Sequence, residues 1–338
     1  MASHRKIPFA SFDKQIRELE ILPGTIYHRF LSRLGKFGAQ RRLFIEQGLY
    51  GETRNLSFLF LRRLRRFIHF FQSVVLRLAG KHAAGLKNAS ELHLEHRPIT
   101  HQHLSPSRPP LQILHLSDFH LDLSPGVISR TIQLLESLEP DLILCTGDFF
   151  DKAASPSNLL LDAYAELLAA APGTIYAVPG NHDTLAAIEA LEQIGYRFLI
   201  NESTSLQVAG YRLFLSGIED PHLYCGEDFE LLRPFPDPSE VDLWILLSHA
   251  PEAYQKAAKA GYHLMLCGHT HGGQICWKEG RPIIGNARVP KFLVTGLWHY
   301  QQLTGHTSRG VGSGQYPVRF NCPPEISLLS VGGPPASY

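Results

Sequence analysis

The chain has 338 residues, of which 44% are hydrophobic and 19% are charged, a balance that excludes an intrinsically disordered chain and suits a large α/β domain with an appendage. Its formal net charge of +1 combines two opposed parts. Residues 1–110 contain 19 Lys and Arg against 7 Asp and Glu, whereas residues 111–338 contain 13 against 24. A basic arm on an acidic body predicts that the two parts meet different partners, with an anionic surface as the partner of the arm.

The cysteine pattern and residues 1–20 give information on the cellular compartment of the protein. The five cysteines show no C-x-x-C spacing, which argues against a zinc knuckle and a redox dithiol and fits a reducing compartment. Residues 1–20 mix acidic with basic side chains and contain no apolar run before a cleavage site, so we expect no secretory signal. Because no stretch of about 18 residues is free of charge, we also expect no membrane-spanning helix. The sequence predicts a cytoplasmic protein.

The N-terminal third is predicted to be separate from the rest. Residues 1–96 are interpreted as a basic arm, and residues 97–110, which contain four prolines, as a linker. Short helical patterns occur in residues 1–53 without strong capping residues. His101 and His103 form an H-x-H pair in the linker, but no strand is predicted before them, so a metal role is disfavoured.

Residues 54–90 include eight basic residues and no acidic residue. On a 3.6-residue helix over residues 60–78, Phe, Leu, Ile and Val lie on one face and Arg on the other. Such a helix can lie in a membrane interface, with its apolar side chains at the acyl boundary and its Arg on lipid phosphates. The residues predicted to contact the membrane are Phe60, Leu64, Phe67, Phe71, Arg62 and Arg66. The alternative is that the apolar face packs on the rest of the chain. Nucleic-acid binding is disfavoured, because no aromatic platform or groove-reading motif accompanies the Arg run.

From Leu111 onward, short apolar runs alternate with helical patterns, which predicts an α/β domain with buried strands over residues 111–338. Strands are expected within residues 111–116, 141–148, 174–183, 211–220, 241–250, 262–273 and 326–331, and helices near 126–138 and 158–170. Most polar signatures follow directly after an apolar run. Ligands of open α/β sheets bind at the carboxyl ends of strands, so we expect the functional site there.

Five of these signatures offer oxygen or imidazole groups and no thiolate: S-D-F-H (117–120), G-D (147–148), G-N-H-D (180–183), S-H (248–249) and G-H-T-H (268–271). Histidine combined with Asp and Asn is a ligand set for manganese, iron or zinc in roughly octahedral or five-coordinate sites. It fits a structural zinc cage less well. Hydrolysis of a phosphoester at two metal ions needs a bridging carboxylate, for which Asp148 is best placed. It also needs a proton for the leaving oxygen, and His182 with Asp183 beside it fits a general acid.

In their order, the five blocks resemble the calcineurin-like metallophosphoesterases, whose pattern is D-x-H, G-D, G-N-H-[DE], H and G-H-x-H; the resemblance spans about residues 111–331. It implies an α/β (α+β) fold, a four-layer β-sandwich flanked by helices, here with a helical N-terminal appendage. It also implies a hydrolase with two divalent metal ions, manganese being preferred over iron or zinc. The Arg that commonly follows the G-D block is absent from G-D-F-F-D (147–151), which leaves the phosphate-clamping groups undefined.

The resemblance assigns a role to each matched residue. Asp118, His120 and His271 would hold one metal ion, Asn181, His249 and His269 would hold the other, and Asp148 would lie between them. His182 would protonate the leaving group and would be oriented by Asp183.

Three further segments resemble the bacterial lipid-associated phosphodiesterases of this family, which include UDP-2,3-diacylglucosamine pyrophosphatases of lipid A synthesis. They are G-H-T-H-G-G-Q-I-C-W (268–277), S-R-G-V-G (308–312) and P-V-R-F-N-C-P-P-E-I (317–326). This implies a lipid-linked nucleotide substrate, cut to UMP and 2,3-diacylglucosamine 1-phosphate, and an enzyme bound peripherally to the inner face of the cell membrane. Arg309 and Arg319 are candidates for contacts to substrate phosphates or, equally, for structural ion pairs, and His299 is a third candidate near the site. The alternatives are a phosphodiesterase for other phospholipids or nucleotides, and a silent membrane scaffold, which the intact ligand set disfavours.

Overall fold

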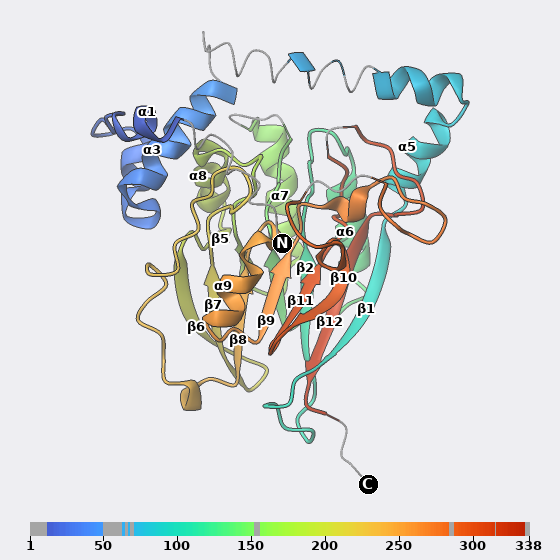
Figure 1. Ribbon diagram of the computed structural model, residues 1–338. Coiled ribbons are helices and arrows are strands. Elements are labelled where there is room, and N and C mark those ends of the chain that lie inside the picture. Colours follow the sequence, from blue (N-terminus) through green and yellow to red (C-terminus); the bar gives the residue numbers. More distant parts are fainter. Residues whose placement is uncertain are drawn as a thin grey trace.

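Two six-stranded sheets lie face to face in the computed structural model, which describes residues 12–49, 63–64, 67, 71–151, 156–283, 287–314 and 316–334 (Figure 1). In spatial order, the first sheet consists of β1 (His93–Thr100), β12 (Glu325–Gly332), β2 (Leu111–Leu116), β3 (Leu142–Cys145), β4 (Ile175–Ala177) and β5 (Arg197–Phe198). The second consists of β10 (Gly296–Tyr300), β11 (Leu303–Thr307), β9 (Leu264–Cys267), β8 (Leu243–Leu247), β7 (Tyr211–Gly217) and β6 (Glu202–Val208).

Helices cover the outer faces of both sheets. The α-helices are α1 (Asp13–Arg17), α2 (Ile26–Arg29), α3 (Leu31–Leu49), α5 (His82–Ser90), α6 (Val127–Leu135), α7 (Asn158–Ala170), α8 (Leu185–Gln193) and α9 (Tyr254–Lys259). Short 3₁₀ helices are η2 (Pro238–Glu240), η3 (Pro251–Ala253), η4 (His271–Gly273) and η5 (Lys291–Leu293). The predicted mixed α/β sandwich flanked by helices is confirmed.

The strands that carry the predicted ligands are parallel neighbours. In the first sheet β2 pairs with β3 and β3 with β4, and in the second sheet β7, β8 and β9 are parallel. Parallel strands end at the same edge of a sheet, so the segments that follow β2, β3, β4, β8 and β9 meet at one end of the sandwich.

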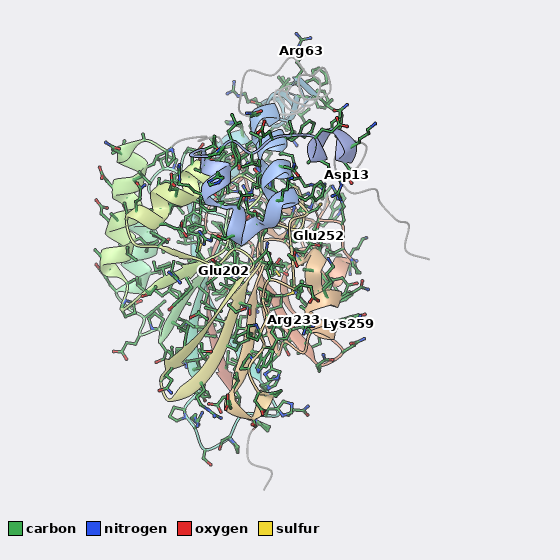
Figure 2. The ribbon with its side chains drawn as sticks, turned by 90° about the vertical axis from the view of Figure 1, so that its left-hand side faces the viewer. Asp13, Arg63, Glu202, Arg233, Glu252 and Lys259 are labelled. Carbon is green, nitrogen blue, oxygen red and sulfur yellow. The ribbon has the colours of Figure 1, made fainter. Side chains whose placement is uncertain are left out.

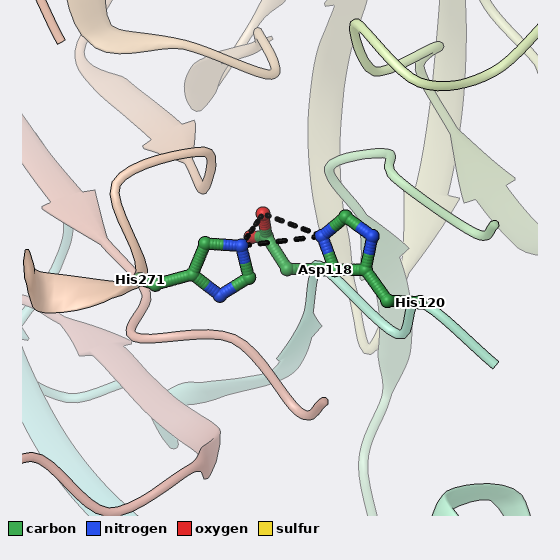
Figure 3. A group of neighbouring side chains, drawn as sticks. All are labelled: Asp118, His120 and His271. Carbon is green, nitrogen blue, oxygen red and sulfur yellow. Dashed lines mark hydrogen bonds and ion pairs between the residues drawn. The ribbon is translucent and has the colours of Figure 1, made fainter. Parts of the chain in front are cut away.

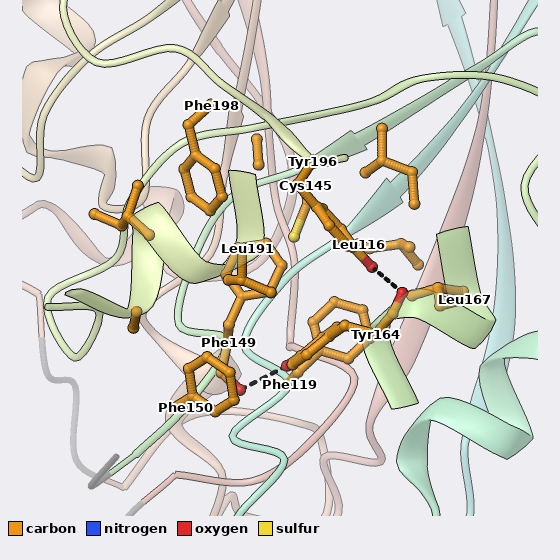
Figure 4. Packing of buried hydrophobic residues seen from close by; sticks show 14 of the residues in the cluster. Leu116, Phe119, Cys145, Phe149, Phe150, Tyr164, Leu167, Leu191, Tyr196 and Phe198 are labelled. Atoms are coloured by element: carbon orange, nitrogen blue, oxygen red, sulfur yellow. Dashed lines mark hydrogen bonds between the residues drawn. The ribbon is translucent and has the colours of Figure 1, made fainter. Parts of the chain in front are cut away.

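Alternation along the strands divides the core into layers. On β2, Ile113 lies in the cluster between the two sheets, whereas Leu114 lies in the cluster under α6, α7 and α8. Because β2 is covered on both faces, its sequence reads as an almost continuous apolar run. The cluster under the helices is rich in aromatic rings, and there the Tyr164 hydroxyl donates to the main-chain carbonyl of Phe149 over 2.6 Å (Figure 4). This bond fixes the segment that follows β3.

The N-terminal segment differs in part from the prediction. Strand β1 pairs in parallel with β12 along its whole length, so it belongs to the first sheet and crosses the boundary predicted between residues 96 and 97. Residues 71–78 are helical, and α1, α3 and α5 lie at one end of the sandwich (Figure 1). Among the described residues, no helix combines the length and the apolar character needed to cross a membrane.

Arginines of α2 and α3 connect the N-terminal helices to the acidic body. Arg29 pairs with Glu189, Arg33 with Glu192 and Glu202, and Arg42 with Glu219. The Arg42 pair is fully buried and bidentate, with N–O distances of 2.6 and 2.9 Å. Arg42 also donates to the main-chain carbonyl of Asp183, in the loop that follows β4.

We predict that Arg42→Ala lowers the free energy of unfolding by about 3–5 kcal/mol, because it leaves the Glu219 carboxylate buried without its partner. Urea denaturation followed by circular dichroism measures this change. Lys36→Ala is the matched control, because Lys36 is exposed on the same helix and its loss should change stability by no more than about 0.5 kcal/mol. Equal stability of the two variants would contradict the role given to Arg42.

Candidate active site

The structure brings together all seven predicted metal ligands. Asp118 and His120 follow β2, Asp148 follows β3, Asn181 follows β4, His249 follows β8, and His269 and His271 follow β9. Asn181 is half-buried, and the other six side chains are buried. The ligand set is therefore assembled at the end of the sandwich where the parallel strands of both sheets finish.

The backbone at these positions is strained. Asp118, His120, Asp148, His269 and His271 have positive φ angles between 42° and 68°. Non-glycine residues adopt this left-handed region at a cost of about 1–3 kcal/mol, and they do so mainly where the surrounding structure enforces it, as at active sites. The left-handed turns aim consecutive polar side chains away from the strands and toward a common point.

Two glycines allow the loops to approach each other. A Cβ atom on Gly180 would collide with the main chain and carboxylate of Asp148, and one on Gly268 would collide with the side chains of Ser117 and Asp118. The glycines of G-N-H-D and G-H-T-H are thus required by close approach of the loops.

The first ligand group consists of Asp118, His120 and His271 (Figure 3). The Nε2 atoms of His120 and His271 lie 3.2 Å apart. Oδ1 of Asp118 is 4.0 Å from the first of these nitrogens and 3.5 Å from the second. Three donor atoms from loops that are about 150 residues apart in sequence therefore face one small volume.

The second ligand group is centred on Asp148, His249 and His269, with Asn181 beside them. Oδ1 of Asn181 lies 3.1 Å from His249 Nε2 and 2.7 Å from His269 Nδ1. Oδ2 of Asp148 lies 3.2 Å from His249 Nε2 and 3.5 Å from His120 Nε2 of the first group. Asp148 thus stands between the two groups, in the position predicted for a bridging carboxylate.

These donor atoms fit two divalent cations. The spacings within each group match neighbouring ligands at about 2.0–2.2 Å from one metal ion. Burial lowers the pKa of His269 and His271 well below the ordinary value, so their imidazoles are neutral, as metal ligation requires. Burial opposes ionisation of Asp148, yet the His249 imidazole beside it holds the pKa of this carboxyl well below its usual range. The same contact raises the pKa of His249 despite its burial, so a cation competes with a proton there.

Hydrogen bonds behind the ligands fix their orientation. Nδ1 of His249 donates to the main-chain carbonyl of Thr146 over 2.6 Å, which leaves Nε2 free to bind a metal ion. Carbonyl acceptors of this kind set ring orientation and tautomer in metal sites. Behind His271, Nη2 of Arg319 lies 3.3 Å from Nδ1, and because a guanidinium only donates, Arg319 packs against this ring without accepting a ring hydrogen.

The surroundings of His182 correct one predicted role. Its Nδ1 donates to the main-chain carbonyl of Asp151 over 2.9 Å, and Oδ1 of Asp151 is 3.7 Å away. The Asp183 carboxylate instead accepts from the backbone nitrogens of Asp148, Gly180 and Phe149 at 2.8–2.9 Å. Asp183 therefore fastens the G-D loop to the G-N-H-D loop, and Asp151 occupies the position beside the His182 ring that was predicted for Asp183.

Two residues near the site were missed in the sequence. Asp151 also lies 3.7 Å from Nδ1 of His120, so it contacts both imidazoles. The available signal was the second Asp of G-D-F-F-D. His222 lines the cavity described below, with its ring centroid 4.1 Å from that of His269 and its Nδ1 2.7 Å from Glu252. No local pattern marks His222, because its neighbours come from distant segments.

None of the three residues predicted to contact substrate is among the residues that line the cavity over the metal ligands. Arg319 is fully buried and donates to main-chain carbonyls of the 309–312 loop and of Cys322. Arg309 pairs with Glu95 and Glu325, each over 2.6 Å. Both guanidinium groups thus serve as structural partners, one of the two alternatives stated for them. His299 is exposed on β10, 3.2 Å from Thr304, and is not among the residues that line the cavity.

A cavity of about 430 Å³ opens over the two ligand groups. His120, Asp148, Asn181, His182, His269 and His271 contribute to its floor. Its walls include Ile275, Ile283 and Tyr316, and Gln72 from the helical residues 71–78. The N-terminal segment therefore contributes a side chain to the lining of the cavity.

Comparisons with known proteins agree with this geometry. A family model for calcineurin-like phosphoesterases matches residues 111–273. The chain is 33% identical over 237 residues to Phosphodiesterase YaeI of Escherichia coli (strain K12), a match that covers 66% of this chain and 82% of that protein. It is 28% identical over 236 residues to the uncharacterized metallophosphoesterase YkoQ of Bacillus subtilis (strain 168), covering 67% and 85%. It is 29% identical over 254 residues to a transmembrane protein with metallophosphoesterase domain of Bos taurus, covering 69% and 55%. The chain belongs to the calcineurin-like metallophosphoesterases and is a metal-dependent hydrolase of phosphoesters.

Proposed function

We propose that this enzyme hydrolyses the pyrophosphate of UDP-2,3-diacylglucosamine, releasing UMP and 2,3-diacylglucosamine 1-phosphate, while it is bound to the inner, anionic face of the cell membrane. The observation that carries the proposal is the position of the cavity, which joins the two ligand groups to an apolar rim and to the basic N-terminal segment. A phosphodiesterase for other phospholipids or nucleotides remains the second candidate, since the name of the Escherichia coli relative specifies only a phosphodiesterase.

Two divalent ions, for which manganese is the preferred choice, would supply an activated water and positive charge for the phosphoryl oxygens. With the seven ligands holding the two ions, the phosphoryl group would lie between the two ligand groups, next to Asp148. Water would attack the phosphorus on the nucleotide side, the bond from that phosphorus to the bridging oxygen would break, and the oxygen of water would remain in UMP.

His182 is positioned to protonate the departing bridging oxygen. It lines the cavity, and its ring centroid is 5.2 Å from that of His120. Because Nδ1 donates to the Asp151 carbonyl, a protonated ring carries its second hydrogen on Nε2 and can give it to the leaving group. Asp151 acts on this step only through the orientation of the ring.

Apolar side chains near the cavity suit acyl chains. Ile275 and Ile283 line its wall, and Ile283 and Trp277 are 48% and 62% exposed. Large apolar groups that remain exposed beside a polar site commonly mark a surface for an apolar ligand or a membrane. The acyl chains of the substrate would leave the cavity along this wall.

The exposure of the helical segment that contributes Gln72 to the cavity supports membrane contact. Phe67, Phe71 and Leu78 are 65%, 60% and 84% exposed, and Leu64 is also exposed, so these members of the predicted apolar face do not pack on the body. Exposed cations accompany them, among them Arg63, which lies at the same end of the molecule as the N-terminal helices (Figure 2). Phe60, Arg62 and Arg66, the other residues predicted to contact membrane, lie outside the described residues.

We predict that His182→Ala lowers kcat about 10²–10⁴-fold on the pyrophosphate substrate while two metal ions remain bound, because it removes the proton donor and no ligand. Steady-state kinetics and metal analysis by atomic emission check this. Asp148→Asn serves as the contrast, since it should lose metal as well as activity.

A substrate with a better leaving group distinguishes loss of acid catalysis from a structural effect of His182→Ala. On bis(p-nitrophenyl) phosphate, whose leaving group departs without a proton, the defect of His182→Ala should shrink markedly. A defect of equal size on both substrates would mean that His182 is not the general acid.

We predict that the manganese-loaded enzyme converts UDP-2,3-diacylglucosamine to UMP, and that in ¹⁸O-water the label appears in UMP. UDP-N-acetylglucosamine, which lacks the acyl chains, should give a kcat/KM at least about tenfold lower, because burial of even two methylenes is worth about 1.6 kcal/mol. Mass spectrometry of the products reads both results. If bis(p-nitrophenyl) phosphate is cleaved and UMP never appears, the substrate assignment is wrong. The assignment as a metal-dependent phosphoester hydrolase still holds in that case.

We predict that Phe67→Ser combined with Phe71→Ser reduces co-sedimentation with phosphatidylglycerol vesicles at least about tenfold, because each buried Phe contributes about 1.5–3 kcal/mol. Leu159→Ser is the control, since Leu159 is 78% exposed on α7 and should not affect binding. Binding of wild type should weaken in high salt and on neutral vesicles. Unchanged sedimentation of the double variant would exclude this face as the membrane contact.

A further inference from the structure

A short hairpin beside the cavity carries an exposed tryptophan. Residues 275–283, called the Trp277 hairpin below, fold back on themselves after the last metal-ligand block. The backbone nitrogen of Ile283 donates to the carbonyl of Ile275 over 3.1 Å, and that of Trp277 donates to the carbonyl of Arg281 over 2.9 Å. These bonds fix the backbone of the hairpin, while 62% of the Trp277 surface stays exposed.

Trp277 differs in this respect from the other two tryptophans of the chain. Trp244 and Trp298 are 6% and 3% exposed and belong to the core. A large apolar side chain left exposed beside a polar site commonly marks a surface that another apolar phase covers. The indole ring combines an apolar body with one polar N–H group, which suits it to the boundary between water and a lipid phase.

The Trp277 hairpin borders the same cavity as the N-terminal helical segment. Ile275 and Ile283 line this cavity from the hairpin, and Gln72 lines it from the helical residues 71–78. Phe71, next to Gln72, is 60% exposed, and Ile283 is 48% exposed. Two segments that are about 200 residues apart in sequence therefore present apolar side chains to solvent around one cavity.

The charges near the indole ring suit an anionic surface. Lys278 and Arg281 are exposed on either side of the turn, and Glu279 is the single carboxylate of residues 275–283. Among the described residues that line the cavity, the sole carboxylate is Asp148, on its floor. An anionic lipid leaflet thus meets a surplus of positive charge on the hairpin and no acidic group on the cavity wall.

We propose that the Trp277 hairpin enters the interface of an anionic lipid leaflet and forms a second membrane contact in addition to residues 60–78. This inference rests on the proposed function, which makes the leaflet the place where the enzyme meets its substrate. The indole ring lies at the level of the headgroups, and Lys278 and Arg281 contact lipid phosphates. The cavity then faces the leaflet, and the acyl chains of the substrate pass along Ile275 and Ile283 without crossing water.

Tryptophan fluorescence tests this contact with a probe that the chain already contains. Because Trp244 and Trp298 are buried, vesicles should change the emission of the folded enzyme mainly through Trp277. Phosphatidylglycerol vesicles should shift the emission to shorter wavelengths, and phospholipid with brominated acyl chains should quench it. Trp277→Phe should abolish both changes although the variant still sediments with the vesicles, which would attribute the changes to this ring.

Vesicle affinity measures the contribution of the ring. Trp277→Ser should weaken binding to phosphatidylglycerol vesicles about tenfold, because it removes a large apolar group from the interface. Its melting temperature should equal that of wild type, since the side chain is exposed. Leu231→Ser is the matched control, because Leu231 is 40% exposed in the loop before η2, does not line the cavity and should not affect binding.

The outcomes separate this inference from the proposed function. If wild type sediments with the vesicles but its emission neither shifts nor is quenched, the Trp277 hairpin is not a membrane contact, and the contact of residues 60–78 still stands. No vesicle binding at all would reject both contacts, whereas UMP release in detergent tests the proposed reaction independently. A blue shift that grows with protein concentration in the absence of vesicles would identify a second copy of the chain as the partner and would reject the lipid.

Discussion

The carboxylate of Asp148 sets the central constraint of this structure. One of its oxygens lies within 3.5 Å of imidazole nitrogens from both ligand groups, in a buried position where water cannot solvate them. Lone pairs so crowded and desolvated are stable only around positive charge. Divalent cations supply that charge, and the fold must deliver the donors to them from five separate loops. The parallel strand ends, the left-handed turns and the close glycine contacts together bring these donor atoms to one place.

The residues that hold these loops are charged groups that do not bind the metal ions themselves. The Asp183 carboxylate accepts from three backbone nitrogens and so joins the loops after β3 and β4. On its other side, the main-chain carbonyl of Asp183 accepts from Arg42. Arg319 binds the carbonyls of the 309–312 loop behind His271. A hydrogen bond between a charged group and the backbone is stronger than one between neutral groups, which suits it to hold strained turns in place.

The sequence predicted the ligands well because each stands directly after a buried strand, where the change from apolar to polar residues is local. Prediction from the sequence failed where a residue's role depends on contacts with residues far away in the sequence. Strand β1 is an edge strand with Ile99 as its one buried residue, so its alternating polar sequence resembles a linker until its pairing with β12, over 200 residues later, is known. Without that strand, His101 and His103 had no expected neighbour, although their ring centroids lie 4.5 and 5.5 Å from that of His263 in the structure. Asp151 was visible in its motif, yet its contact with His182 depends on how two loops fold together.

The basic residues of the first 110 positions fall into two groups, those paired with glutamates of the body and those exposed to solvent. Part of the positive charge in the first 110 residues is neutralised within the molecule, by the pairs of Arg29, Arg33 and Arg42 with glutamates of the body. These ion pairs reduce the positive charge that the arm presents to an external partner, so the predicted attraction to an anionic surface depends mainly on the other cations. The cations still exposed include Arg63, Arg77, Lys81 and Lys87, all within the acid-free segment 54–90. That segment also contributes Gln72 to the cavity wall. Attraction to an anionic surface would therefore act next to the active-site cavity, on the side where the proposed lipid-linked substrate would approach.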